Sequence, residues 1–159
     1  MYHRLAALAA LVVVGVSCMG PIRVPPPTPR TIQSSFPIAR PFDAVWQATT
    51  EVFAELNLPI LNVEKASGLI TTDWISFRGQ SNEAGYCDCG QTRFPLGEVD
   101  RQGRFNVYVK RIGEDACELM VNSVFEKVAR YQEVVERTAC VSTGNLEATM
   151  HQRVMEKLQ

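Results

Sequence analysis

Long apolar runs, blocks of like charge and histidine are all scarce in this sequence of 159 residues. The longest apolar run, Leu5 to Val16, is well short of the about 20 residues that a membrane-spanning helix needs. The 16 basic and 17 acidic residues are interspersed, with a formal net charge of −1, so no basic surface for nucleic acid is expected. These shortages argue against a permanent membrane span and against electrostatic binding of nucleic acid.

Catalytic patterns are scarce as well. His3 lies in a segment that we expect to be removed, which leaves His151 as the one histidine of the mature chain. His151 follows the apolar stripe of an expected helix, so a surface residue is the simpler interpretation. Neither a Gly-x-Ser-x-Gly turn nor a phosphate-loop lysine is present, and Glu114 and Asp115 lie in a tight turn, where acidic residues are ordinary. We expect no enzyme activity, no catalytic residue and no cofactor.

The N-terminus has the pattern of a secretory signal, with Arg4, the short apolar run and then small residues. The sequence Gly15-Val16-Ser17-Cys18 resembles a bacterial lipobox, although Gly15 stands where Leu is usual. We expect residues 1–17 to be a lipoprotein signal peptide and the mature chain to begin at an acylated Cys18. The alternatives are an ordinary signal peptide cut nearby and an uncleaved anchor. Met19 stands where an inner-membrane retention signal has Asp, so in a Gram-negative host we expect the outer membrane, facing the periplasm.

Proline is concentrated after Cys18, at positions 21, 25, 26, 27 and 29. Proline fixes φ and lacks an N–H donor, so this segment favours an extended polyproline conformation of about 3.1 Å per residue. We expect residues 18–30 to be a tether that holds the folded domain away from the membrane and does not pack on that domain. Residues 31–159 then form one domain of ordinary size.

Hydrophobic periodicity predicts an α+β fold. Residues 41–57 carry apolar side chains at helical spacing, and residues 142–159 repeat this pattern. Segments that favour strands are 31–38, 60–63, 69–77, 104–112 and 116–128. The order β-α-β-β-β-β-α predicts an antiparallel sheet of about five strands with two helices on one face, and the last three strands in a meander. A long polar loop, 78–103, carries two cysteines.

The segment from Pro41 to Trp74 resembles the repeated domain of the BamC family of outer-membrane assembly lipoproteins. The likeness rests on Ala44-Val45-Trp46 in the helix, Ser67-Gly68 in the hairpin turn and a following strand that ends in Thr72-Asp73-Trp74. The resemblance implies the fold, a membrane address and an accessory or scaffold role. BamC-type proteins carry two such domains and a long N-terminal segment that docks on another subunit, whereas this chain has room for one domain and a short tether.

Four cysteines follow Cys18, namely Cys87, Cys89, Cys117 and Cys140. An even number in an exported chain favours disulfides. Zinc sites and thiol oxidoreductases generally use Cys-x-x-Cys spacing, so the Cys-x-Cys pair in a loop favours neither, and no metal site is expected. In the predicted meander the cysteine loop and the crossing before Cys140 lie at the same end, and Cys117 lies at the other. One loop cysteine is therefore expected to pair with Cys140.

The tail CVSTG resembles that of other single-domain bacterial lipoproteins with a cysteine-bearing loop, and this resemblance implies that Cys89 is the partner of Cys140. Cys87 could then bond Cys117 if the loop runs back along the sheet edge; the alternative is a buried thiol at Cys117. Ser142-Thr143-Gly144 could hold an anion before the last helix, but a helix cap by Ser142 or Thr143 is favoured.

Two functions are consistent with these features. The leading expectation is a non-enzymatic, lipid-anchored envelope protein that works by contact with another envelope protein, for which a filled core and a polar surface would be the sign. The alternative is a binding module for a small apolar ligand or lipid, which an exposed apolar groove between the sheet and the first helix would favour. A thiol or metal protein ranks last.

Overall fold

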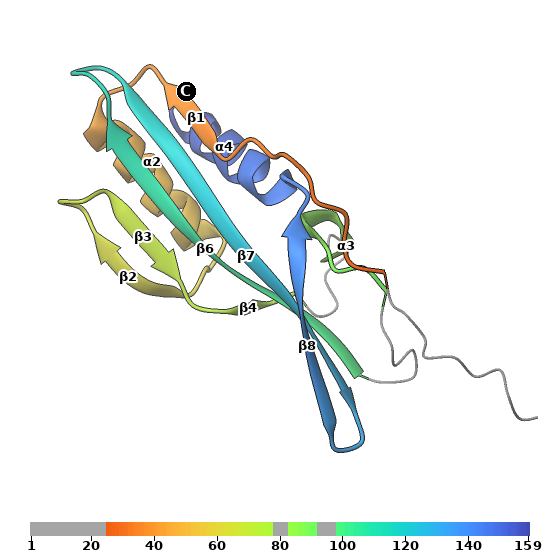
Figure 1. The fold of residues 1–159 in the computed structure, drawn as a ribbon. Coiled ribbons are helices and arrows are strands. Elements are labelled where there is room, and N and C mark those ends of the chain that lie inside the picture. The colour runs from red at the N-terminus through yellow and green to blue at the C-terminus, as the bar shows by residue number, and fades with distance from the viewer. Residues whose placement is uncertain (1–24, 78–82, 92–97) are drawn as a thin grey trace, which may run out of the picture.

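Two long strands form the centre of the fold in the computed structural model, which describes residues 25–77, 83–91 and 98–159. Strands β6 (Glu98–Arg111) and β7 (Cys117–Tyr131) pair in antiparallel register along their full length (Figure 1). Alternate residues of both strands, such as Val107 and Val121, are fully buried on one face. The alternation of apolar and polar residues in the sequence therefore identifies the buried face of this hairpin correctly.

The shorter strands pair with the two outer edges of the β6–β7 hairpin. Strands β3 and β4 pair with β6, with β2 beyond β3, while β1 and β8 pair with opposite ends of β7, with β5 beyond β8. The bounds of these strands are β1 Ser35–Ile38, β2 Ile60–Glu64, β3 Leu69–Thr72, β4 Ile75–Ser76, β5 Cys87–Asp88 and β8 Val134–Ser142. All strand pairs among the described residues are antiparallel, and these residues form a sheet of eight strands.

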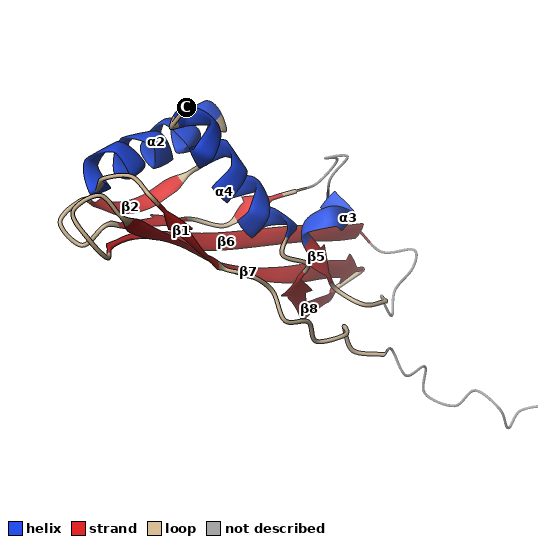
Figure 2. Cartoon of the chain, turned by 90° about the horizontal axis from the view of Figure 1, so that it is seen from above, coloured by secondary structure: helices blue, strands red, loops and turns tan. Residues whose placement is uncertain are grey.

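Helices α2 (Phe42–Glu55) and α4 (Asn145–Lys157) cover the same face of the sheet (Figure 2). A third, short helix, α3 (Glu83–Tyr86), precedes β5. Helix α2 buries the stripe that the sequence predicts, namely Phe42, Val45, Trp46, Ala48, Thr49, Val52 and Phe53. The core lies between this stripe, the apolar face of α4 and the inward residues of β6 and β7. The predicted α+β class with an antiparallel sheet is confirmed.

The predicted number of strands is wrong, because the sheet has eight rather than about five. The largest omission is β8, in which exposed and half-buried residues alternate weakly and only Ser142 is buried. The expected strand 69–77 is split into β3 and β4 at Asp73 and Trp74. The two-residue strand β5 lies in the expected loop. Each omission is a strand with a short or weak hydrophobic pattern.

The described part of the proline-rich segment contacts the domain, contrary to the expectation that it spaces without packing. A Cβ atom on Gly90 would lie 2.9 Å from the carbonyl oxygen of Pro25 and 3.4 Å from the nitrogen of Pro27. Arg30 forms an ion pair with Asp88, with 3.7 Å between Nη2 and Oδ2. The expected signal peptide and Cys18 lie outside the described residues. Among those that are described, no helix is long and apolar enough to cross a membrane.

Candidate functional site

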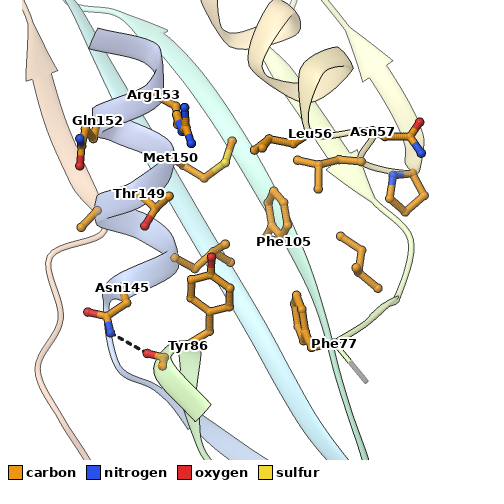
Figure 3. Close-up of a pocket in the computed structure, with 16 residues that line it drawn as sticks. Leu56, Asn57, Phe77, Tyr86, Phe105, Asn145, Thr149, Met150, Gln152 and Arg153 are labelled. Carbon is orange, nitrogen blue, oxygen red and sulfur yellow. Dashed lines mark hydrogen bonds between the residues drawn. The ribbon is translucent and has the colours of Figure 1, made fainter. Parts of the chain in front are cut away.

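A groove of about 760 Å³ lies between the end of α2, the first half of α4 and the sheet (Figure 3). Its floor is made by core side chains, namely Phe77, Phe105, Leu146 and Met150. Phe105 comes from the middle of β6, and its ring packs on Phe53 of α2 with 5.8 Å between ring centroids. The floor is therefore rigid, because the residues that form it also hold the helices on the sheet.

Polar side chains surround this floor. Asn57 lies just beyond α2, while Asn145, Gln152 and Arg153 belong to α4. The Arg153 guanidinium lies 3.6 Å from a carboxylate oxygen of Glu156 and stays about half exposed. The groove thus combines an apolar floor with a hydrogen-bonding and cationic edge, the usual composition of a ligand pocket.

Helix α3 closes one end of the groove with the Tyr86 ring, which lies 5.8 Å from the Phe77 ring between centroids (Figure 3). Thr143, just before α4, and Asn145, the first residue of α4, hold α3 in place. The Thr143 N–H donates to the Tyr86 carbonyl at 3.0 Å, and Asn145 Nδ2 donates to the Gly85 carbonyl at 2.7 Å. Thr143 and Asn145 therefore fix the position of α3 against the start of α4.

The start of α4 differs from the predicted helix cap. Gly144, with a positive φ of 87°, is the N-cap residue and makes no side-chain cap bond. Ser142 Oγ accepts from the Gly144 N–H at 3.1 Å and donates to the buried Glu147 carboxylate at 3.0 Å. Ser123 Oγ donates to the same carboxylate. The sequence Ser142-Thr143-Gly144 thus serves a buried hydrogen-bond network in place of a simple cap.

Three cysteines meet beside α3. The register of β5 on β8 sets Cys87 opposite Ser142 and Asp88 opposite Val141, so the next pair along is Cys89 and Cys140. Those two residues form a disulfide, with a Cα–Cα distance of 4.2 Å. This is the pairing that the lipoprotein resemblance implied. Cys87 Sγ lies 3.6 Å from Cys89 Sγ, and the three sulfur atoms lie within 4.8 Å of one another.

Three clustered sulfur atoms are a possible ligand set for a soft metal ion. Here two of the three, Cys89 and Cys140, are joined in the disulfide, and a disulfide sulfur is not a thiolate ligand. The oxidised arrangement therefore favours sulfur exchange chemistry over metal binding.

The predicted second disulfide, between Cys87 and Cys117, is absent from the structure, and this prediction is wrong. Cys117 is a buried thiol opposite Ile38 at the start of β7, whereas Cys140 pairs with Phe125 of the same strand. Residues 117 and 125 are separated by roughly 27 Å along an extended strand at about 3.4 Å per residue. The loop stays at the Cys140 end, and burial raises the pKa of the Cys117 thiol.

Lys127 fixes the loop that carries the disulfide. Its side chain points inward from β7, and the residue is only 3% exposed. The ammonium donates to the carbonyl oxygens of Cys89 at 3.1 Å and Gln91 at 2.5 Å. Burial lowers the pKa of Lys127. A lysine at an inward position of a strand is the sequence pattern that indicates such a buried, hydrogen-bonded ammonium.

His151 is half-buried, whereas a surface residue was expected. Its ring stacks on Phe36 of β1 with 4.4 Å between centroids and an interplanar angle of 6°. Burial lowers the pKa of His151. His151 does not line the groove or the cysteine cluster. The histidine therefore joins α4 to β1 and serves packing.

Neither the groove nor the position of α3 follows from sequence patterns, because their residues come from α2, β4, β6, α3 and α4. The resemblance of the CVSTG tail to other lipoproteins indicated the cysteine pairing, whereas no sequence pattern indicated the groove. A scan against protein-family models and a search of curated proteins found no match to this chain.

Proposed function

We propose that this chain is a non-enzymatic binding module of the cell envelope, and that its groove holds a small apolar ligand or a lipid. The observation that carries the proposal is the groove of about 760 Å³ with an apolar floor and a polar edge. Its size falls within the roughly 300–1,000 Å³ that is common for ligand pockets. The described residues that line it include no carboxylate, imidazole or thiol, which suits binding by apolar contact and hydrogen bonds.

The chemistry of the edge favours an amphipathic ligand. An acyl chain would cover the partly exposed apolar residues of the groove, Leu56, Leu58 and Ile75. The Arg153 guanidinium would face an anionic head group. Burial of each CH₂ contributes about 0.8 kcal/mol, which corresponds to a change in Kd of about fourfold per carbon. Affinity for a series of fatty acids should rise with chain length until the groove is filled.

Fluorescent fatty-acid binding tests this proposal, with chain lengths from eight to sixteen carbons. Thr149→Trp places a large side chain on the wall of the groove and should weaken binding at least tenfold. Met155→Trp is the matched control, because Met155 is an exposed residue of the same helix outside the groove. Equal binding by both variants, or no dependence on chain length, would contradict the proposal. A neutral methyl ester series separates the contribution of Arg153 from that of the floor.

The proposed address is the outer membrane, facing the periplasm, with a lipid anchor on Cys18. The short apolar run, the lipobox-like Gly15–Cys18 and the proline-rich tether support it. The resemblance of residues 41–74 to the BamC domain supports the same address and an accessory role in outer-membrane assembly. A binding module close to a membrane surface has direct access to lipids.

Contact with an envelope protein is the second candidate function, and strand β2 is the observation that favours it. Strand β2 is at the end of the sheet order, and its apolar residues Ile60, Leu61 and Val63 are 45%, 69% and 51% exposed. Sheet edges in monomeric proteins are usually protected by charge, proline or a covering element. An apolar edge of this kind suits the addition of a strand from a partner protein.

In-cell photo-crosslinking tests the second candidate. A photoreactive amino acid at position 61 should give one discrete crosslinked species, which Val63→Lys should abolish. The same amino acid at Glu51, an exposed position on α2, is the control and should give none. Equal crosslinking at both positions would rule out a specific contact at β2.

A further inference from the structure

The proposed groove function leaves the cluster of three cysteines without a role. Cys87 and Cys89 are each 5% exposed, and Cys140 is half-buried. Strand alternation places residues 87 and 89 on the same face, so the Cys87 sulfur lies beside the disulfide. The distance of 3.6 Å from Cys87 Sγ to Cys89 Sγ is a contact distance between sulfur atoms. A thiol is thus held next to a disulfide that it can attack.

A hollow of about 450 Å³ opens on this cluster. Its lining includes Cys87 and Cys89 and three charged residues, Arg30, Asp88 and Arg101. Arg30 is bound to the domain by its ion pair with Asp88. Cationic neighbours stabilise a thiolate, which is the nucleophile in disulfide exchange. Because the hollow admits solvent, the proton of the Cys87 thiol can leave to water.

We propose that Cys87, Cys89 and Cys140 form a thiol–disulfide exchange centre. The Cys87 thiolate attacks Cys89 Sγ, so that a Cys87–Cys89 bond forms and the Cys89–Cys140 bond breaks. Cys140 leaves as a thiolate and takes up a proton, which balances the proton lost by Cys87. These three cysteines make up one disulfide and one thiol before and after the exchange, so no outside oxidant or reductant is needed.

The exchange changes which thiol the protein presents. Before it, the thiol is on the 5%-exposed Cys87; after it, the thiol is on the half-buried Cys140 of β8. The disulfide then closes within the loop and no longer joins the loop to β8. The reaction partner that fits such a centre is a disulfide of another envelope molecule, which the released Cys140 thiolate attacks, so that a mixed disulfide forms and the partner's second sulfur leaves as a thiolate. This inference does not depend on the proposed ligand groove.

Disulfide mapping of the full-length protein tests the proposal. The oxidised protein is held at pH 8 without added thiol, quenched in acid at intervals, labelled with N-ethylmaleimide under denaturing acidic conditions and digested with pepsin. The expected result is a growing fraction, at least a tenth of the molecules, with labelled Cys140 and an internal Cys87–Cys89 disulfide. Cys117→Ala is the control and should behave as the wild type, because Cys117 lies at the far end of β7.

Cys87→Ser should hold the Cys89–Cys140 disulfide intact and leave Cys140 unlabelled under the same conditions. Should that variant fail to fold, the pH dependence of the wild type replaces it, since a thiolate mechanism speeds exchange about tenfold per pH unit while the thiol is mostly protonated. The proposal is overturned when Cys89–Cys140 stays intact in the wild type at every time point. Labelling of Cys140 that is independent of Cys87 or of pH overturns it equally.

Discussion

At the turn between β2 and β3, backbone conformation and packing alone require glycine at position 68. Its φ is +77°, and a Cβ atom there would lie 2.2 Å from the carbonyl oxygen of Val109. The Val109 N–H donates to the Gly68 carbonyl at 2.8 Å, which ties the turn to β6. The Ser-Gly pair that carries part of the BamC resemblance thus has a physical reason here, because only glycine fits this approach.

We therefore expect Gly68→Ala to lower the free energy of unfolding by about 2 kcal/mol or more, from positive-φ strain together with the backbone clash. Urea denaturation measures the loss. Ala66→Ser, in the same turn at an exposed position, is the control and should stay within about 0.5 kcal/mol of the wild type. A Gly68→Ala protein as stable as this control would contradict the packing of the turn on β6.

His151 makes stability depend on pH below the ordinary histidine pKa of about 6.5. Because burial lowers its pKa in the folded state, the unfolded chain binds a proton at higher pH than the folded chain does. Stability is therefore full above the unfolded pKa of about 6.5 and is lost as the pH falls through the lower folded pKa. His151→Gln should flatten this part of the profile, as measured by thermal unfolding at each pH.

Asp43→Asn is the control variant for the pH profile of His151→Gln. The hydrogen bond and charge of Lys65 lower the pKa of Asp43, so its contribution is present above its unfolded pKa of about 3.9 and is lost at still lower pH. The variant should leave the slope in the pH range where His151 titrates unchanged. A profile of His151→Gln that matches the wild type would show that the stacked histidine is not the titrating group.

At the scale of elements, α3 links the cysteine cluster to the groove. Gly85 lines both the groove and the hollow over the cysteines, and Tyr86 precedes Cys87 directly. The disulfide closes a sequence separation of 51 residues, which in the chain-entropy model stabilises the fold by roughly 4 kcal/mol. The same bond that stabilises the domain therefore also holds one end of the groove.

We expect Cys140→Ser to lower the free energy of unfolding by about 2–4 kcal/mol and to weaken fatty-acid binding, because α3 loses its covalent neighbour. Chemical denaturation and the fluorescent binding assay measure the two effects. Cys117→Ala is the control for thiol removal, and it should leave ligand affinity unchanged. Unchanged affinity in Cys140→Ser would separate the groove from the disulfide.

The elements that the sequence predicts well are those with a regular period of buried and exposed side chains. Helix α2 and strands β6 and β7 have such patterns, since one face of each packs on the core. Strand β8 escaped prediction because it pairs with the end of β7 that projects from the body (Figure 1), and Ser142 is its one buried residue. The groove could not be predicted, because it exists only where α2, α3 and α4 come together.

At the scale of the whole molecule, the proline-rich segment is part of the domain surface as well as a connection. Replacing residues 25–30 with Gly and Ser should lower the free energy of unfolding by about 1 kcal/mol, since the contact with Gly90 and the Arg30–Asp88 ion pair are lost. Arg30→Gln removes only the exposed ion pair and should change stability by less. A midpoint of denaturation identical to that of the wild type would show that the segment acts only as a spacer.

The proposed membrane address rests on Cys18, and the segment after Cys18 contacts the domain at Pro25. An acyl chain contributes about 0.8 kcal/mol per buried CH₂, and stable anchoring takes more than one chain, so a multiply acylated N-terminal cysteine should hold the protein firmly on the membrane. Cys18→Ala should leave the protein unprocessed or release it from the membrane fraction, and labelling with radioactive palmitate should disappear. Cys117→Ala serves as the control for loss of a cysteine and should keep both membrane partitioning and label. Normal processing and unchanged partitioning of Cys18→Ala would refute the lipid anchor, and the groove would then have to receive its ligand from solution.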